Sequence, residues 1–152
     1  MDKDLNGIQI VILGFARQGK AFAQYAAEHG AKVIVSDLRS EEQLQESMDA
    51  LQHLQIEYVL GNHPMSLLEG TDMLVISGGI PANIPLVKAA RRQGIVITND
   101  SQEFSTHCPA KIIGITGSAG KSTTTALVGE MAKAANRRTW VGEFQSEQLI
   151  FG

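Results

Sequence analysis

Short runs of β-branched and other apolar residues alternate with helical patterns along most of this chain. Six runs are expected to form buried strands, at residues 8–13, 32–36, 56–60, 73–77, 95–98 and 111–116. Short apolar runs without polar alternation are typical of parallel strands, because helices cover both faces of such sheets. The alternation therefore predicts an α/β fold with a doubly wound parallel sheet.

Helix start signals fall in the segments between these runs. Ser40 and Gln43 have the spacing of a capping box, and Pro85 suits the first turn of a helix. Asp100 with Glu103 is expected to cap a further short helix. These signals place helices between consecutive strands, as parallel pairing requires.

Composition excludes several classes of protein. Hydrophobic residues make up 43% of the 152 residues, and the net charge is −3 with no long basic run. We therefore expect a globular cytoplasmic protein, a monomer, with no nucleic-acid or membrane partner. The single cysteine, Cys108, excludes an internal disulfide, and the four histidines lack metal-ligand spacing. We do not expect His107 and Cys108 to act as a catalytic pair, since neighbours in a polar loop seldom do.

A glycine-containing turn follows the first predicted strand. It reads Gly14-x-Ala16-x-x-Gly19 and leads into a helix, which is a degenerate form of the dinucleotide-binding fingerprint. Asp37 ends the second strand, where an acid can accept a hydrogen bond from a ribose or a base. The motif predicts a Rossmann-like nucleotide site. By itself it does not distinguish NAD from a UDP-linked ligand, and it is also compatible with a packing turn that binds nothing.

A second glycine turn follows the fourth predicted strand. It comprises Ser77, Gly78, Gly79 and Ile80. In open α/β sheets, ligands bind outside the carboxyl ends of the strands. Both turns are therefore expected at one edge of the sheet.

A third glycine turn, within GITGSAGKSTTT at residues 114–125, has the parts of a phosphate-binding loop. The usual spacing would need glycine where Ile115 stands, yet Gly117 and Gly120 loosen the turn before a predicted helix. Lys121 is expected to reach the β- and γ-phosphates of ATP, and Ser122 to hold Mg²⁺. The turn predicts the start of a P-loop ATPase domain.

The variant spacing Gly-x-Thr-Gly-[Ser/Thr]-x-Gly-Lys-[Ser/Thr] resembles the ATP loop of the Mur ligases, which build the peptidoglycan precursor. The resemblance extends over nearly the whole chain, through VILGFARQGKA, VIVSD, LVISGGIPANIPLVKAARRQGIVI, the Glu103–Phe104 pair and KIIGITGSAGKSTTTALVGEMAKAA. Within the family these stretches are most similar to the members that add D-glutamate. The segment SGGIP is similar to their Ser-Pro-Gly-Ile.

The resemblance implies a role for each glycine turn. The UDP-substrate would be bound by three groups of residues. Its diphosphate would contact Gly14, Phe15, Ala16 and Arg17, and its uracil would contact Asp37, Leu38 and Arg39. The nucleotide-sugar would lie along Ser77, Gly78, Gly79 and Ile80. ATP binding would fall to Gly117, Ser118, Ala119, Gly120, Lys121, Ser122 and Thr123, with Lys121 catalytic and Ser122 on the metal.

The function implied is ATP-dependent amide formation with Mg²⁺. UDP-N-acetylmuramoyl-L-alanine and D-glutamate would be the substrates, and an acyl phosphate the intermediate. Two alternatives stay open at this point: another muramyl ligase that adds L-alanine or recycles peptides, and a non-catalytic Rossmann module that binds NAD.

The chain departs from the family near its end. Family members are about three times longer, so we expect a substrate domain at residues 1–108 and a truncated ATP-binding domain at 109–152, inactive by itself. Glu143 begins a segment similar to a later family motif whose leading glutamate binds Mg²⁺, although it follows Lys121 by only 22 residues. Glu143 is therefore either a metal ligand or part of a solvated tail.

Overall fold

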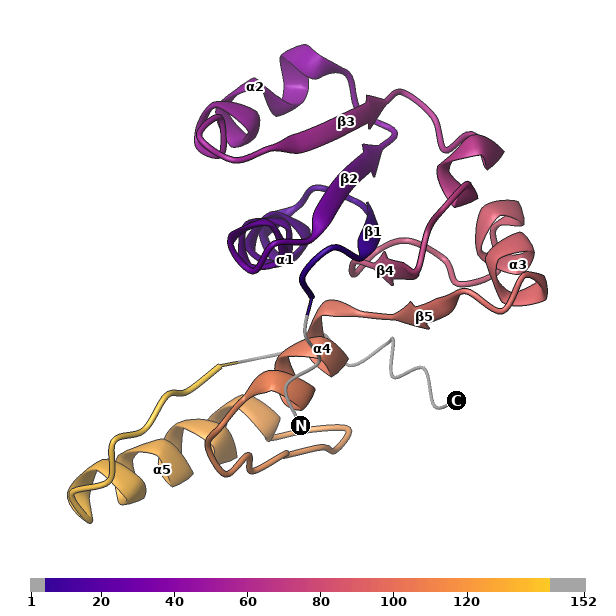
Figure 1. Cartoon of the computed structure of the whole chain (residues 1–152). Coiled ribbons are helices and arrows are strands. Elements are labelled where there is room, and N and C mark those ends of the chain that lie inside the picture. Colours follow the sequence, from indigo (N-terminus) through magenta and orange to yellow (C-terminus); the bar gives the residue numbers. More distant parts are fainter. Residues whose placement is uncertain (1–4, 143–152) are drawn as a thin grey trace. The chain divides into compact units, whose positions relative to one another are not determined.

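The computed structural model describes residues 5–142. They divide into two compact units, one ending at His107 and the other beginning at Cys108. The first unit holds a parallel β-sheet, and the second holds one long helix with its flanking segments. Figure 1 shows the elements of each unit.

The sheet of the first unit has five parallel strands in the order β3-β2-β1-β4-β5 (Figure 1). Their bounds are β1 Gln9–Leu13, β2 Lys32–Asp37, β3 Ile56–Leu60, β4 Met73–Ile76 and β5 Val96–Thr98. The chain starts in the centre at β1, proceeds outward to β3 and then returns to the other side of β1 at β4. This reversal creates a topological switch point between β1 and β4, and it confirms the predicted doubly wound α/β fold.

Helices cover both faces of this sheet, as the apolar strand runs predict. The helical segments are α1 Arg17–Glu28, α2 Glu41–Asp49, the 3₁₀ helix η1 Met65–Leu68, α3 Pro85–Arg92 and α4 Asp100–His107. Helices α1 and α2 pack on one face, where Phe22 and Leu44 meet Ile10, Ile12 and Val35. On the other face, η1 and α3 pack against the alternate side chains of the same strands (Figure 1).

The predicted helix signals are largely confirmed. The capping box of α2 is present, with Gln43 Oε1 accepting from the Ser40 N–H at 3.0 Å, and Pro85 begins α3. The predicted cap of α4 is wrong by one residue. Asn99 caps the helix, because its Oδ1 accepts from the Gln102 N–H at 2.8 Å, and Asp100 lies inside the helix.

The sixth predicted strand, residues 111–116, is not formed. This segment has no strand partner in the second unit, and Ile113 is 72% exposed. An apolar run becomes a strand only when neighbouring strands pair with its backbone groups. The helix that follows, α5 Lys121–Ala134, is present, with Leu127 and Met131 exposed on its surface.

Among residues 5–142, no helix is both long and apolar enough to cross a membrane.

Gly19 should be the position of the first unit that least tolerates a side chain. A Cβ there would fall on the carbonyl oxygen of Gly14 and 2.6 Å from Ser77 Oγ. Helix propensity alone would make Gly19→Ala stabilising. We expect Gly19→Ala instead to lower the free energy of unfolding by about 1–3 kcal/mol through overpacking, measured by chemical denaturation.

Gly114→Ala is the matched control, because a Cβ at Gly114 meets no atom within 4 Å. Equal stability of the wild type and Gly19→Ala would contradict the close approach of α1 to the sheet.

Candidate nucleotide site

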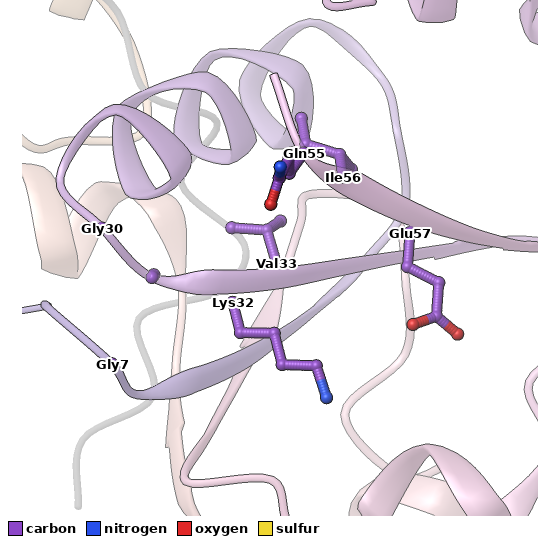
Figure 2. A pocket seen from close by; sticks show the side chains of 8 residues that line it. Gly7, Gly30, Lys32, Val33, Gln55, Ile56 and Glu57 are labelled. Carbon is purple, nitrogen blue, oxygen red and sulfur yellow. The ribbon is translucent and has the colours of Figure 1, made fainter.

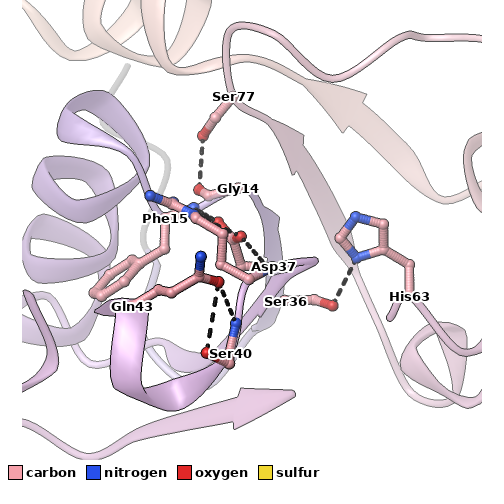
Figure 3. A network of polar contacts seen from close by, with 9 residues as sticks. Gly14, Phe15, Ser36, Asp37, Ser40, Gln43, His63 and Ser77 are labelled. Carbon is pink, nitrogen blue, oxygen red and sulfur yellow. Dashed lines mark hydrogen bonds and ion pairs between the residues drawn. The ribbon is translucent and has the colours of Figure 1, made fainter. Parts of the chain in front are cut away.

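The first two glycine turns meet at the carboxyl edge of the sheet, at the switch point between β1 and β4. Ser77, directly after β4, donates its hydroxyl to the Gly14 carbonyl at 3.2 Å (Figure 3). The Gly14 N–H in turn donates to the Ser36 carbonyl at 2.8 Å. The ends of β1, β2 and β4 are therefore joined through one residue, and the prediction that Gly14 and Ser77 share an edge is confirmed.

The backbone of the first turn requires glycine. Gly14 has φ +88°, a conformation that side chains disfavour, and it lies against Ser77 and Ile80. Gly19, one turn into α1, allows the helix to approach the Gly14 carbonyl closely. These are two of the roles that glycines have in the dinucleotide-binding fingerprint.

Helix α1 begins at this edge with an open N-terminus. Its N-cap residue, Ala16, has no side chain that can accept from the first-turn N–H groups, and the first turn holds no acidic residue. Ala16 and Arg17 are exposed, whereas Gly14 and Phe15 are buried. Free N–H groups, the positive end of the helix dipole and an exposed arginine together suit an anion such as a diphosphate.

Asp37, at the end of β2, is a buried carboxylate that accepts hydrogen bonds at both oxygens. Oδ2 accepts from the Phe15 N–H and from Arg39 Nη2, both at 2.7 Å. Oδ1 accepts from the backbone N–H and Nε of Arg39, both at 2.9 Å. Asp37 therefore holds the first glycine turn to the end of β2 (Figure 3).

These contacts hold the pKa of Asp37 well below its ordinary value of 3.8. Burial by itself raises the pKa, but hydrogen bonds from the Arg39 side chain and backbone and from the Phe15 N–H outweigh it. Asp37 is thus ionised at neutral pH. Leu38 is 66% exposed and the Arg39 side chain 43% exposed, so both present surface to solvent at this edge.

The second turn continues the same edge. Ser77 is buried, Gly78 and Gly79 are exposed, and Ile80 is partly buried. The structure therefore brings together all three groups of predicted UDP-site residues, at the ends of β1, β2 and β4. That they bind a nucleotide stays a prediction.

Sequence reasoning missed His63, which follows β3 at this edge. Its Nδ1 lies 2.8 Å from Ser36 Oγ, and Ser36 is fully buried (Figure 3). Burial lowers the pKa of His63, and the charge of Asp37 partly opposes this. The available signal was a polar residue in the short loop after a predicted parallel strand, three residues beyond its end, but the search for metal-ligand spacing did not detect it.

The third glycine turn lies in the second unit. Gly120 has φ +74° and is the N-cap of α5, whose first residue is Lys121. Lys121 Nζ donates to the Gly117 carbonyl at 2.7 Å, so the ammonium group lies over its own loop. Residues 117–120, together with Ser122 and Thr123, are exposed.

The start of α5 has the chemistry of an anion site. No side chain caps it and no acidic residue lies in its first turn. The residues present therefore fit a phosphate group, and the Ser122 side chain is exposed beside them. Within the described part of the chain, no three metal-ligating side chains cluster, and Glu143 lies outside the described residues.

A shallow groove of about 460 Å³ lies at the amino edge of the sheet instead (Figure 2). It is lined by Gly7 and by residues 30–33 and 55–57, at the starts of β2 and β3. Lys32 and Glu57 project beside it. Because nucleotide sites of doubly wound sheets lie at the carboxyl edge, the groove is not the candidate site.

The first unit is a doubly wound α/β fold with two glycine turns at the carboxyl edge of its sheet, and the second unit carries a further glycine turn before a helix. Residues 8–99 match the family model described as Mur ligase MurD-like, N-terminal domain. The chain belongs to the Mur ligase family.

Two relatives named UDP-N-acetylmuramoylalanine–D-glutamate ligase are clearly similar in sequence. That of Alkaliphilus metalliredigens is 39% identical over 140 residues, which cover 91% of this chain and 31% of the relative. That of Geobacter metallireducens is 37% identical over 147 residues, covering 97% and 32%. The chain thus spans about a third of the length of these relatives.

Solved structures agree on the fold. UDP-N-acetylmuramate-alanine ligase MurC from Thermotoga maritima has a TM-score of 0.56 at 22% identity, covering 85% of this chain and 30% of that one. A pseudomurein peptide ligase type C from Methanothermus fervidus has a TM-score of 0.55 at 24% identity, covering 85% and 26%.

Acid should remove the contribution of Asp37 to stability. Because its folded-state pKa lies below 3.8, the contribution is fully present above pH 3.8 and is lost as the pH falls through the folded-state value. We expect Asp37→Asn to be less stable than the wild type at pH 7, with a difference that shrinks in acid, measured by denaturation across the pH range.

Asp49→Asn makes the same chemical change at an exposed position and should show little such dependence. A stability difference for Asp37→Asn that is independent of pH would show that the carboxylate charge is not what holds the turn.

Proposed function

We propose that the first unit binds the UDP moiety of UDP-N-acetylmuramoyl-L-alanine, and that the glycine turn before α5 binds ATP, in a ligase that adds D-glutamate. The observation that carries this proposal is the meeting of three predicted ligand segments at one sheet edge. There the Ser77 hydroxyl and the Asp37 carboxylate fix the turn at Gly14 and Phe15. The names of the similar relatives supply the substrate class.

Each segment has a role suited to its chemistry. The open N-terminus of α1 and the exposed Arg17 suit the diphosphate. Asp37 supports nucleotide binding indirectly, by holding Phe15 and Arg39 in place, because its two oxygens already accept four hydrogen bonds from these residues. Arg39 and Leu38 are then the exposed groups beside the base. This refines the prediction that Asp37 itself meets the uracil.

The reaction proposed for the complete enzyme requires ATP because a carboxylate and an amine do not condense spontaneously in water. The L-alanyl carboxylate attacks the γ-phosphorus of ATP, and ADP leaves. The amine of D-glutamate then attacks the acyl phosphate, and inorganic phosphate leaves as the amide forms. Transfer between anions depends on positioning and charge neutralisation.

The second unit would supply part of that neutralisation. Lys121 would leave the Gly117 carbonyl for the β- and γ-phosphates, and the N–H groups at the start of α5 would face phosphate oxygens. Mg²⁺, when bound, would offset phosphate charge beside the Ser122 hydroxyl. Without a strand beneath the loop, this site is less preorganised than the site of the first unit, so its affinity should be lower.

The 152-residue chain should bind UDP and fail to ligate. A ligand at 100 times its Kd stabilises the folded state by about 2.7 kcal/mol, so UDP should raise the unfolding temperature measurably. NAD at the same concentration serves as the control. Phosphate release with ATP, D-glutamate and the UDP-sugar should stay at background, because the described residues include no metal-ligating cluster.

Stabilisation by NAD and not by UDP would replace this proposal with that of a non-catalytic Rossmann module. Phosphate release that depends on D-glutamate would show that the 152-residue chain already carries the chemistry.

The loop before α5 is testable through its own amides. Titration with Mg²⁺ and ATP should shift the NMR signals of residues 117–123. We expect Lys121→Ala to weaken this binding about tenfold or more, since hydrogen bonds to charged groups contribute more than neutral ones. Lys133→Ala removes an exposed lysine that pairs with Glu130 and should have no effect. Equal titrations of Lys121→Ala and the wild type would contradict the ATP-loop assignment.

A further inference from the structure

His63 is held at the nucleotide edge by a chain of hydrogen bonds that fixes which ring nitrogen is available. Ser36 Oγ lies 3.1 Å from the Asn62 carbonyl and 2.8 Å from His63 Nδ1. A hydroxyl has one proton, and a carbonyl oxygen only accepts. Both contacts are attractive only if Ser36 donates to Asn62 and accepts from His63 Nδ1–H.

This arrangement defines the chemistry of the other ring nitrogen. Burial lowers the pKa of His63, which Asp37 only partly opposes, so the ring is neutral at pH 7. With the proton on Nδ1, Nε2 carries a lone pair and acts as an acceptor. Nε2 has no hydrogen-bond partner among residues 5–142 and is not one of their buried polar atoms, so it is open to a ligand. Figure 3 shows it on the ring side away from Ser36.

The position of His63 relates it to the nucleoside end of the proposed site. The Gly61 N–H donates to the carbonyl of Asp37 at 2.8 Å and to that of Arg39 at 3.2 Å. The loop after β3 is therefore tied to the loop after β2, which carries the exposed Arg39. His63 lies two residues beyond this tie, on the same edge of the sheet.

We propose that His63 Nε2 accepts a hydrogen bond from the nucleoside half of the UDP ligand, and that His63 is a specificity-determining residue of this site. The proposal rests on the proposed function. A nucleoside offers two kinds of donor here, the uracil N3–H and the ribose hydroxyls. A diphosphate offers only acceptors at neutral pH, so it does not match a neutral Nε2.

The tautomer is tested first, without any ligand. Two-bond ¹H–¹⁵N NMR correlations of the free 152-residue chain at pH 7.5 should show His63 neutral and protonated on Nδ1. Ser36→Ala should remove this preference. A wild-type His63 protonated on Nε2 would overturn the inference while leaving the UDP proposal intact.

Binding is tested with UDP by calorimetry. His63→Asn keeps a polar group near the position of Nδ1 but removes the acceptor at Nε2, and we expect it to weaken UDP binding about threefold to tenfold. His63→Gln, which restores a polar group near Nε2, should recover part of this loss. His53→Asn changes an exposed histidine and is the matched control. Unchanged affinity of a folded His63→Asn would overturn the inference.

Three analogues identify the donor: N3-methyl-UDP, 2′-deoxy-UDP and 3′-deoxy-UDP. Against the analogue that lacks the donor, His63→Asn should bind as tightly as the wild type. If His63→Asn binds all three analogues more weakly than the wild type does, by the same factor as for UDP, the proposed contact is overturned. If the wild type binds no UDP at all, the proposed function fails and this inference with it, whichever tautomer the NMR shows.

Discussion

The close approach of α1 to the centre of the sheet is the constraint on which the proposed site depends. Gly19 leaves room for the carbonyl of Gly14 and the hydroxyl of Ser77, and the Ser77 hydroxyl donates to that carbonyl. A helix held this close has its open N-terminus at the carboxyl edge of the sheet, where β1 and β4 end. The packing of α1 on the sheet and the position of its open N-terminus are therefore consequences of the same contact.

Charge is distributed around this contact in a consistent way. Asp37 is buried, ionised and occupied with Phe15 and Arg39, so it organises the edge from within. Arg17 and Arg39 are exposed at this edge, and Arg39 pairs with Asp37 while part of its side chain stays open to solvent. Buried carboxylates need such partners, because an unpaired charge in the interior is costly. Asp37, which sequence patterns assign to ligand binding, also holds the first glycine turn to the end of β2 in this fold.

The two units differ in how completely their apolar side chains are buried and their strand segments are paired. In the first unit each central strand has partners on both sides and helices above and below, so its apolar side chains are buried. The second unit presents Ile113, Leu127 and Met131 to solvent, and its apolar segment before the glycine turn forms no strand. The proposed nucleotide site of the first unit is therefore better defined than the proposed phosphate loop of the second.

The sequence by itself determined the elements whose signals are local. The five strand runs, the capping box at Ser40 and the glycine turn at Gly14 all predict what the structure contains, because periodicity, caps and turns depend on neighbouring residues. The placement of Gly14 and Ser77 at one edge also followed, since parallel strands share the direction of their carboxyl ends.

Only the tertiary structure decided features that depend on residues far apart in the chain. Whether residues 111–116 pair as a strand depends on neighbours that a local pattern does not contain. The partners of Asp37 at Phe15 and of Ser36 at His63 are 22 and 27 residues away. Hydrogen bonds across such separations depend on which strands lie next to each other in the sheet. The spatial order of the strands brought Asp37 to the first glycine turn and His63 to the same carboxyl edge of the sheet.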